Sequence, residues 1–308
     1  MGIICELFPG QMQKMLSVLE DRLNEIQEIR LRVGRPVIIV IRGTEHFISK
    51  NGQVVKKPHE GLLISKEDME AVIVHICRAS VYAYEEEIRK GFITVKGGHR
   101  VGISGQAVLA KNGEMKTIKN ISFINIRIAH EVKGVADKLM HCMYENGRIH
   151  NTLIISPPGF GKTTLLRDII RNISDGSPYA EGRTCSIIDE RSELAGSYNG
   201  IPQLDVGMRT DVMDACPKSI GMMMAIRSMA PQIVAVDELG TAEDIKALFS
   251  VIRSGCSILA TVHGDDLESL YEKSFLKEVM DEKVFTRYIV IKNQRHETNI
   301  YNGELEKC

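Results

Sequence analysis

Hydrophobic positions are spaced differently in the two parts of this 308-residue chain. In the first part they alternate with polar positions, as at Ile29, Leu31 and Val33 with Arg30 and Arg32 between them, which is typical of half-buried strands. In the later part, short unbroken apolar runs are separated by stretches of helical spacing, which is typical of a parallel sheet covered by helices. The pattern predicts a smaller α+β domain over residues 1–130, with mixed or antiparallel strands, and an α/β domain over residues 131–308.

Two segments near these strands have helical spacing instead. Residues 65–78 are preceded by a capping signal, because Ser65 stands at the N-cap position and Asp68 follows three residues later. Residues 134–145 have a similar spacing and lead into the first strand of the second domain. We expect a helix at each of these places.

In the second domain, apolar runs that suit buried strands alternate with helical stretches. Asp189, Asp237 and His263 each follow one of these runs directly. Parallel strands direct their carboxyl ends to one edge of a sheet, and ligands bind at that edge. The predicted strands cover residues 152–155, 184–188, 231–236, 258–262 and 287–292.

The stretch from Thr152 to Arg171 has the order of elements that a phosphate-binding P-loop requires: an apolar strand, a glycine loop and an amphipathic helix. Glycines allow backbone N–H groups to converge on phosphate oxygens, and the helix directs its positive dipole end at them. Lys162 would reach the β- and γ-phosphates of a nucleotide, and the hydroxyl of Thr163 would hold Mg²⁺. Ser156 stands where the usual pattern has its first glycine. The predicted nucleotide-binding residues are Ser156, Pro157, Pro158, Gly159, Phe160, Gly161, Lys162, Thr163 and Thr164.

Two acidic clusters follow apolar strands. Asp237 and Glu238 have the pattern of a Walker B motif, in which one acid binds Mg²⁺ and the neighbouring acid orients the attacking water. We expect their strand to neighbour the P-loop strand. Asp189 and Glu190 could also supply the carboxylate that activates water for phosphoryl transfer. The alternative for that cluster is an acid-rich helix start, which the helix dipole favours.

The remaining candidates for chemistry are cationic or polar. His263 follows a strand and precedes a glycine, so it could sense a γ-phosphate. The charge on a transferring phosphoryl group requires an arginine, often from a neighbouring subunit. Arg209 and Arg227 of the second domain and Arg100 and Arg127 of the first are candidates, and the sequence does not choose among them.

Composition excludes several classes of protein. A hydrophobic fraction of 44% and a charged fraction of 26% are those of a soluble globular protein. A net charge of −1 gives no general attraction to nucleic acid, and no apolar run approaches the ~18 residues that a membrane span requires. Seven dispersed cysteines without a C-x-x-C pair indicate free thiols in a reducing cytoplasm rather than a zinc site. We therefore expect a cytoplasmic protein without a signal peptide, a transmembrane segment or a nucleic-acid partner.

Four blocks together resemble the stage III sporulation protein AA family, which is similar to the type II, type IV pilus and type IV secretion ATPases. The blocks are SPPGFGKTTLLRD, SIIDERSELAG, QLDVGMRTDVMDACPKSIGMMMAIRSMAPQIVAVDELG and ATVHG. The first domain is similar more loosely, through EIRLRVGRPVIIVIRG. The resemblance implies a RecA-like P-loop ATPase domain that binds ATP and Mg²⁺ and forms a homo-oligomeric ring, a hexamer. It also implies peripheral docking, on the mother-cell side, to membrane proteins of a channel that joins mother cell and forespore.

By the same likeness, Ser156 to Thr164 correspond to Walker A, Val236 to Glu238 to Walker B, Asp189 to Glu193 to the Asp box and His263 to the His box. The order of the acids leaves Asp189, Glu190 and Glu238 all eligible as the water-activating base. Two other functions remain open on the sequence alone. One is a nucleic-acid motor, which the balanced charge disfavours, and the other is a non-catalytic nucleotide-binding scaffold, which the intact Lys162 and Thr163 disfavour.

Overall fold

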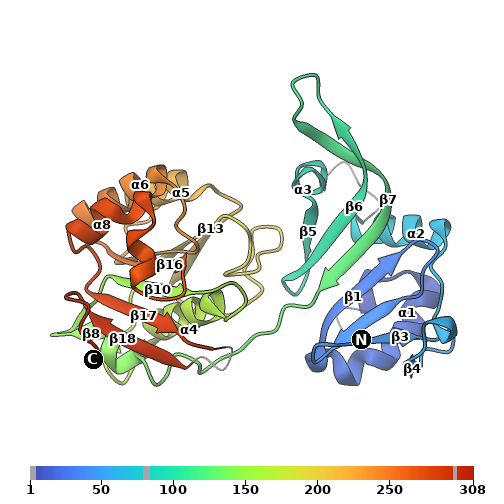
Figure 1. The fold of residues 1–308 in the computed structure, drawn as a ribbon, viewed down its shortest axis with the longest axis horizontal. Helices are drawn as coiled ribbons and strands as arrows, with labels where there is room; N and C mark the ends of the chain where they lie inside the picture. Colours follow the sequence, from blue (N-terminus) through green and yellow to red (C-terminus); the bar gives the residue numbers. More distant parts are fainter. Residues whose placement is uncertain (1–4, 79–83, 294–296) are drawn as a thin grey trace. The chain divides into compact units, whose positions relative to one another are not determined.

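The structure is a computed structural model that describes residues 5–78, 84–293 and 297–308. The chain divides into two compact units, residues 1–130 and 131–308. Each unit is built on its own seven-stranded sheet (Figure 1).

The first unit is an antiparallel sheet with helices packed on it. Its strand order is β4-β3-β2-β1-β7-β6-β5, and every neighbouring pair is antiparallel. Ser65 caps helix α2 through a capping box, since its hydroxyl accepts from the N–H of Asp68 and the Asp68 carboxylate accepts from the N–H of Ser65, both at 3.0 Å. The helices are α1 (Gly10–Leu16), α2 (Lys66–Ile76) and α3 (Glu85–Lys90), and the strands are β1 (Ile26–Arg32), β2 (Ile38–Ile41), β3 (Thr44–Ile48), β4 (Val54–Val55), β5 (Phe92–Val95), β6 (His99–Leu109) and β7 (Met115–Arg127).

The second unit is a parallel sheet with one antiparallel edge strand. Its strand order is β14-β13-β15-β16-β10-β17-β18, and only the pair β17–β18 is antiparallel. Each of β10, β13 and β15 is buried along its whole length, as expected for strands covered on both faces. The strands are β10 (Thr152–Ser156), β13 (Cys185–Asp189), β14 (Thr210–Asp214), β15 (Ile233–Val236), β16 (Ser257–His263), β17 (Arg287–Ile291) and β18 (Thr298–Asn302).

Helices cover both faces of this parallel sheet. Leu153 and Ile155 of β10 belong to one apolar core, which includes buried residues of α5 and α6, whereas Ile154 belongs to a second core with the buried residues of α4. This alternation along one strand is the packing of a doubly wound α/β domain. The helices are α4 (Lys162–Asp175), α5 (Lys218–Ser228), α6 (Ala242–Arg253), α7 (Glu268–Tyr271) and α8 (Lys277–Asp281).

Two expectations about elements are wrong. The strand that carries Asp237 does not neighbour the P-loop strand, because β16 lies between β10 and β15 and pairs with both. Residues 134–145 are not an α-helix but turns followed by a short 3₁₀ helix, Met140–Met143. Here the N–H of Ala136 donates to the carboxylate of Asp168 on α4, at 2.8 Å, so this segment is tied to its neighbour. Across the described residues, no helix is both long and apolar enough to cross a bilayer.

Candidate nucleotide-binding site

The carboxyl ends of four neighbouring strands meet at one edge of the second unit's sheet. Ser156 at the end of β10 pairs with His263 at the end of β16, and Val236 at the end of β15 pairs with Ala260 of β16. Asp189 ends β13, which lies on the other side of β15. The topology therefore gathers the glycine loop, both acidic clusters and the histidine at the edge where ligands bind in such sheets.

The loop between β10 and α4 has the backbone conformation that a phosphate cradle needs. Gly159 has φ +79° and Gly161 has φ +88°, a region in which glycine is favoured because it has no Cβ. Helix α4 begins at Lys162 with no side-chain cap, so its first N–H groups remain available to an anion. Ser156 is fully buried and donates its hydroxyl to the carbonyl of Pro157 at 2.9 Å, which shows how serine fits in place of the usual glycine.

Thr163 and Asp237 come together from different elements. The Thr163 hydroxyl donates to one carboxylate oxygen of Asp237 at 2.6 Å, and the hydroxyl of Thr261 on β16 donates to the other. Thr261 also accepts the backbone N–H of Glu238, at 2.8 Å. A hydroxyl beside a carboxylate is the kind of oxygen donor set that Mg²⁺ takes in phosphate sites, where waters and phosphate oxygens complete its octahedron. The pair therefore fits the ion that the P-loop implies.

Glu238 lies among cationic and polar side chains at the centre of the site. Its carboxylate contacts Arg191 and the Nε2 atom of His263, and Nε2 lies 3.4 Å from the Nζ atom of Lys162. Its backbone has φ +63°, which is uncommon for a residue with a side chain and often marks a functional position. The Nδ1 atom of His263 is buried and has no hydrogen-bond partner among the described residues.

The acids of the second cluster, Asp189 and Glu190, each bind other groups of the protein. Asp189 is 2% exposed, and its two carboxylate oxygens accept the N–H groups of Glu193 and Ala195, both at 2.8 Å. Burial raises the pKa of Asp189 from 3.8 to about 6, although these backbone hydrogen bonds act in the opposite direction. The carboxylate of Glu190 pairs with Lys218 at the start of α5. Asp189 therefore organises the loop that follows β13.

Within the second unit, the candidates Arg209 and Arg227 lie away from Lys162. Arg209 precedes β14 and donates to the carbonyls of Ser174 (2.8 Å) and Asp175 (3.4 Å), at the C-terminal end of α4. Arg227 is exposed in the last turn of α5, whereas the first residue of that helix, Lys218, contacts Glu190 beyond the carboxyl end of β13. The first unit holds the other two: the guanidinium of Arg100 lies over the ring of Phe92, and Arg127 lies 3.7 Å from Glu28.

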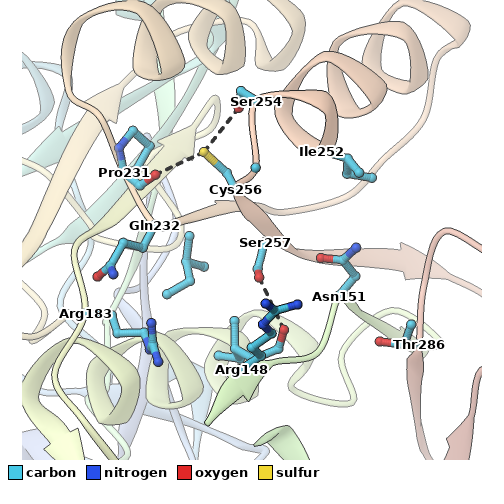
Figure 2. Close-up of a pocket in the computed structure, with 13 residues that line it drawn as sticks. Arg148, Asn151, Arg183, Pro231, Gln232, Ile252, Ser254, Cys256, Ser257 and Thr286 are labelled. Atoms are coloured by element: carbon cyan, nitrogen blue, oxygen red, sulfur yellow. Dashed lines mark hydrogen bonds between the residues drawn. The ribbon is translucent and has the colours of Figure 1, made fainter. Parts of the chain in front are cut away.

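A cavity of about 690 Å³ lies at the amino ends of the strands of the same sheet, opposite the candidate site (Figure 2). Its walls include the first residues of β15 and β16 and Thr286, which precedes β17. Cys256 bonds there to the carbonyl of Pro231. None of its lining residues carries a carboxylate, and Arg148 and Arg183 contribute its positive charge. The cavity is therefore separate from the glycine loop and shares no residue with the candidate site.

Comparison with known proteins agrees with the sequence blocks. A family model described as "Sporulation stage III, protein AA" matches residues 2–306. The chain belongs to this family. It is 41% identical to the stage III sporulation protein AA of Bacillus subtilis (strain 168) over 290 residues, which are 94% of this chain and 90% of that relative. The resemblance that the P-loop and acidic blocks suggested is confirmed.

Solved structures confirm the fold class of this stage III sporulation family member. The ATPase DotB of Legionella pneumophila matches with a TM-score of 0.57 at 18% identity, over 91% of this chain and 75% of that chain. The pilus retraction motor PilT with bound ADP matches with a TM-score of 0.57 at 13% identity, over 90% of this chain and 77% of that one. At these identities the likeness establishes the fold: a RecA-like α/β domain preceded by an antiparallel sheet.

Four residues at the site were not singled out by sequence reasoning. Thr261 is buried inside an apolar strand, and its polarity there was the available signal. Arg191 contacts Glu238, and Lys218 contacts Glu190. No local sequence pattern indicates either ion pair. Arg167 is 7% exposed on α4, five positions after Lys162, and a charged residue on the buried face of a helix is unusual enough to be noticed.

Proposed function

We propose that this protein binds ATP with Mg²⁺ and hydrolyses it as a subunit of a ring-forming secretion-type ATPase. The observation that carries the proposal is the convergence of Lys162, Thr163 and Asp237 at the mouth of a glycine loop, on a sheet with the fold of secretion ATPases. Each of the three has the chemistry that its place in a nucleotide site requires.

The glycine loop and the start of α4 would bind the phosphates through backbone N–H groups, with the Lys162 ammonium against the β- and γ-phosphates. Thr163 and Asp237 would hold Mg²⁺, which when bound supplies positive charge to the phosphate oxygens. Thr261 keeps the Asp237 carboxylate in place through its hydroxyl. His263, next to Lys162, would contact the γ-phosphate.

Among the three eligible acids, Glu238 is the best candidate to orient the attacking water. Asp189 accepts two backbone N–H groups in a buried place, and Glu190 is paired with Lys218. Glu238 is also paired, with Arg191 and His263, but His263 lies next to Lys162. Glu238 therefore adjoins the place where the terminal phosphate would sit. A carboxylate there could accept a proton from the water that attacks the γ-phosphate.

The assembly that we propose is a hexameric ring of identical subunits. Support comes from the fold shared with DotB and PilT and from the place of the arginines. Since Arg209 and Arg227 lie away from Lys162 of their own chain, each is available to act on a neighbouring subunit. Family membership supports a cytoplasmic role on the mother-cell side of the forespore membrane, where the ring would dock on membrane proteins of a channel.

The test is steady-state ATP hydrolysis with Mg²⁺ across a range of protein concentrations, with the mass of the assembly measured in parallel. We expect activity that rises with assembly and that disappears in Lys162→Ala. Lys246→Ala removes an exposed lysine of α6 and serves as the matched control, which should keep full activity. Unchanged turnover in Lys162→Ala would refute the proposal. ATP binding without turnover would point to a scaffold, and strong stimulation by DNA or RNA would point to a nucleic-acid motor.

A further inference from the structure

The loop that follows β13, residues 190–195, is held from two sides by side chains of opposite charge. On one side, the buried carboxylate of Asp189 accepts the N–H groups of Glu193 and Ala195. On the other side, the guanidinium of Arg167 donates to the carbonyl of Glu193 at 2.8 Å and to the carbonyl of Leu194. The peptide groups of this turn are therefore fixed at both their donors and their acceptors.

Arg167 belongs to helix α4, the helix that begins at Lys162. It is only 7% exposed, and its hydrogen bonds among the described residues go to the loop carbonyls alone. Burial lowers the pKa of Arg167, while Asp189 and Asp237 act on it in the opposite sense. A buried cation without a close carboxylate partner is costly, and an apolar side chain would fill the same space at lower cost. Its hydrogen bonds to two loop carbonyls give it a role other than packing.

The same loop reaches the Walker B acid. Arg191, one residue into the loop, contacts the carboxylate of Glu238, and Ser192 donates to Asp214 of β14 at 2.6 Å. The backbone of Ser192 has φ +53°, so the turn between these two contacts is held in a left-handed conformation. A chain of contacts thus runs from α4 through Arg167 and the loop to Arg191 and Glu238.

We propose that Arg167 is a positioning residue that sets the Arg191 guanidinium against Glu238, so that nucleotide binding at the start of α4 is transmitted to the acid that orients water. The proposal rests on the proposed ATPase function of the site. Arginine suits this task because its planar fork presents two N–H donors in a fixed geometry, which matches two successive carbonyls. Lysine at the same place keeps the charge but loses the second directed donor.

The experiment is a double-mutant cycle on ATP hydrolysis by the full chain, with Arg167→Lys, Arg191→Gln and both together. We expect Arg167→Lys to lower kcat about tenfold while KM and the affinity for a fluorescent ATP analogue change by less than about threefold. In the Arg191→Gln background, Arg167→Lys should then cost less than about twofold in kcat, because the contact through which it acts is gone. Two independent effects that simply multiply would overturn the proposal.

Arg171→Lys is the matched control, because Arg171 lies one turn further along α4 and donates both its Nε and Nη2 groups to Asp168 rather than to the loop. It should leave kcat unchanged and show no coupling to Arg191→Gln. If the loss of activity in Arg167→Lys equals the fraction of that variant that is unfolded, Arg167 has a structural role. That result would also overturn the proposal.

Hydrogen exchange gives a second readout that does not require turnover. Addition of a non-hydrolysable ATP analogue with Mg²⁺ should slow exchange at the P-loop and at residues 190–195 of the wild type. In Arg167→Lys we expect protection of the P-loop alone. Equal protection of the loop in both proteins would overturn the coupling, whereas absence of P-loop protection in the wild type would refute nucleotide binding itself.

Discussion

The Thr163 hydroxyl lies 2.6 Å from a carboxylate oxygen of Asp237, although 74 positions separate them in the chain. Thr163 lies in the first turn of α4, which follows β10, and Asp237 follows β15. Strand β16 lies between β10 and β15. The intervening strand does not separate them, because Thr261 of β16 bonds to the same carboxylate. Three elements thus bring the Thr163 hydroxyl and the Asp237 carboxylate together.

Thr261→Val should weaken the use of Mg²⁺. Valine has nearly the same shape, but without the hydroxyl one oxygen of Asp237 and the N–H of Glu238 lose their partner, at a cost of about 1–3 kcal/mol in stability. We expect the Mg²⁺ concentration for half-maximal hydrolysis to rise about tenfold, as for other residues that orient metal ligands. Thr152→Val is the control, because it removes a buried hydroxyl at the start of β10, away from Asp237. It should affect stability only. An equal Mg²⁺ requirement in both variants would contradict this role.

Glu238→Gln should trap ATP on the protein. The amide keeps the size of the side chain but cannot accept a proton from water, so we expect turnover to fall about 10²-fold or more while ATP still binds. Rapid-quench and equilibrium binding measurements separate the two effects. Glu190→Gln is the informative comparison, because its carboxylate is paired with Lys218 and the variant should lose much less. A larger loss in Glu190→Gln would move the base to the other acidic cluster.

Gly159→Ala should weaken nucleotide binding beyond its effect on stability. At φ +79° an alanine is strained by roughly 1–2 kcal/mol, although no atom of the protein lies within 4 Å of the new Cβ. Gly113→Ala provides a matched control, since Gly113 has φ +83° and equally open surroundings in the β6–β7 hairpin. Both variants should lose similar stability by urea denaturation. Only Gly159→Ala should lose affinity for ATP, because its Cβ would enter the space of the phosphates.

Asp189 should make stability depend on pH in an unusual direction. Its pKa in the folded protein is about 6, above the value of 3.8 expected when unfolded, so the native state holds the proton more tightly. The stabilisation is therefore fully present below the unfolded value and is lost as the pH rises through about 6. Relative to Asp189→Asn, the wild type should lose roughly 1–3 kcal/mol of unfolding free energy between pH 4 and pH 7. Urea denaturation of both proteins at several pH values measures this, and parallel curves would contradict it.

Local pattern was sufficient for the buried central strands of the second unit, but it missed β14 and β18. Unbroken apolar runs predicted β10, β13, β15, β16 and β17, because strands buried on both faces tolerate few polar residues. The pattern was insufficient for residues 134–145, where helical spacing was present but the N–H of Ala136 bonds to Asp168 instead. A hydrogen bond to a distant side chain leaves no periodic signal, so local spacing could not reveal it.

The sequence by itself determined that a glycine loop joins a strand to a helix and that acids follow other strands, because strand, turn and helix preferences act over a few neighbouring residues. The tertiary structure alone decided the order of the strands. That order brings Thr261 to Asp237 and leaves Asp189 buried against backbone N–H groups. It also sets Arg167 against the loop that contains Arg191. These relations depend on which surfaces pack together, and packing is a property of the whole chain rather than of any segment.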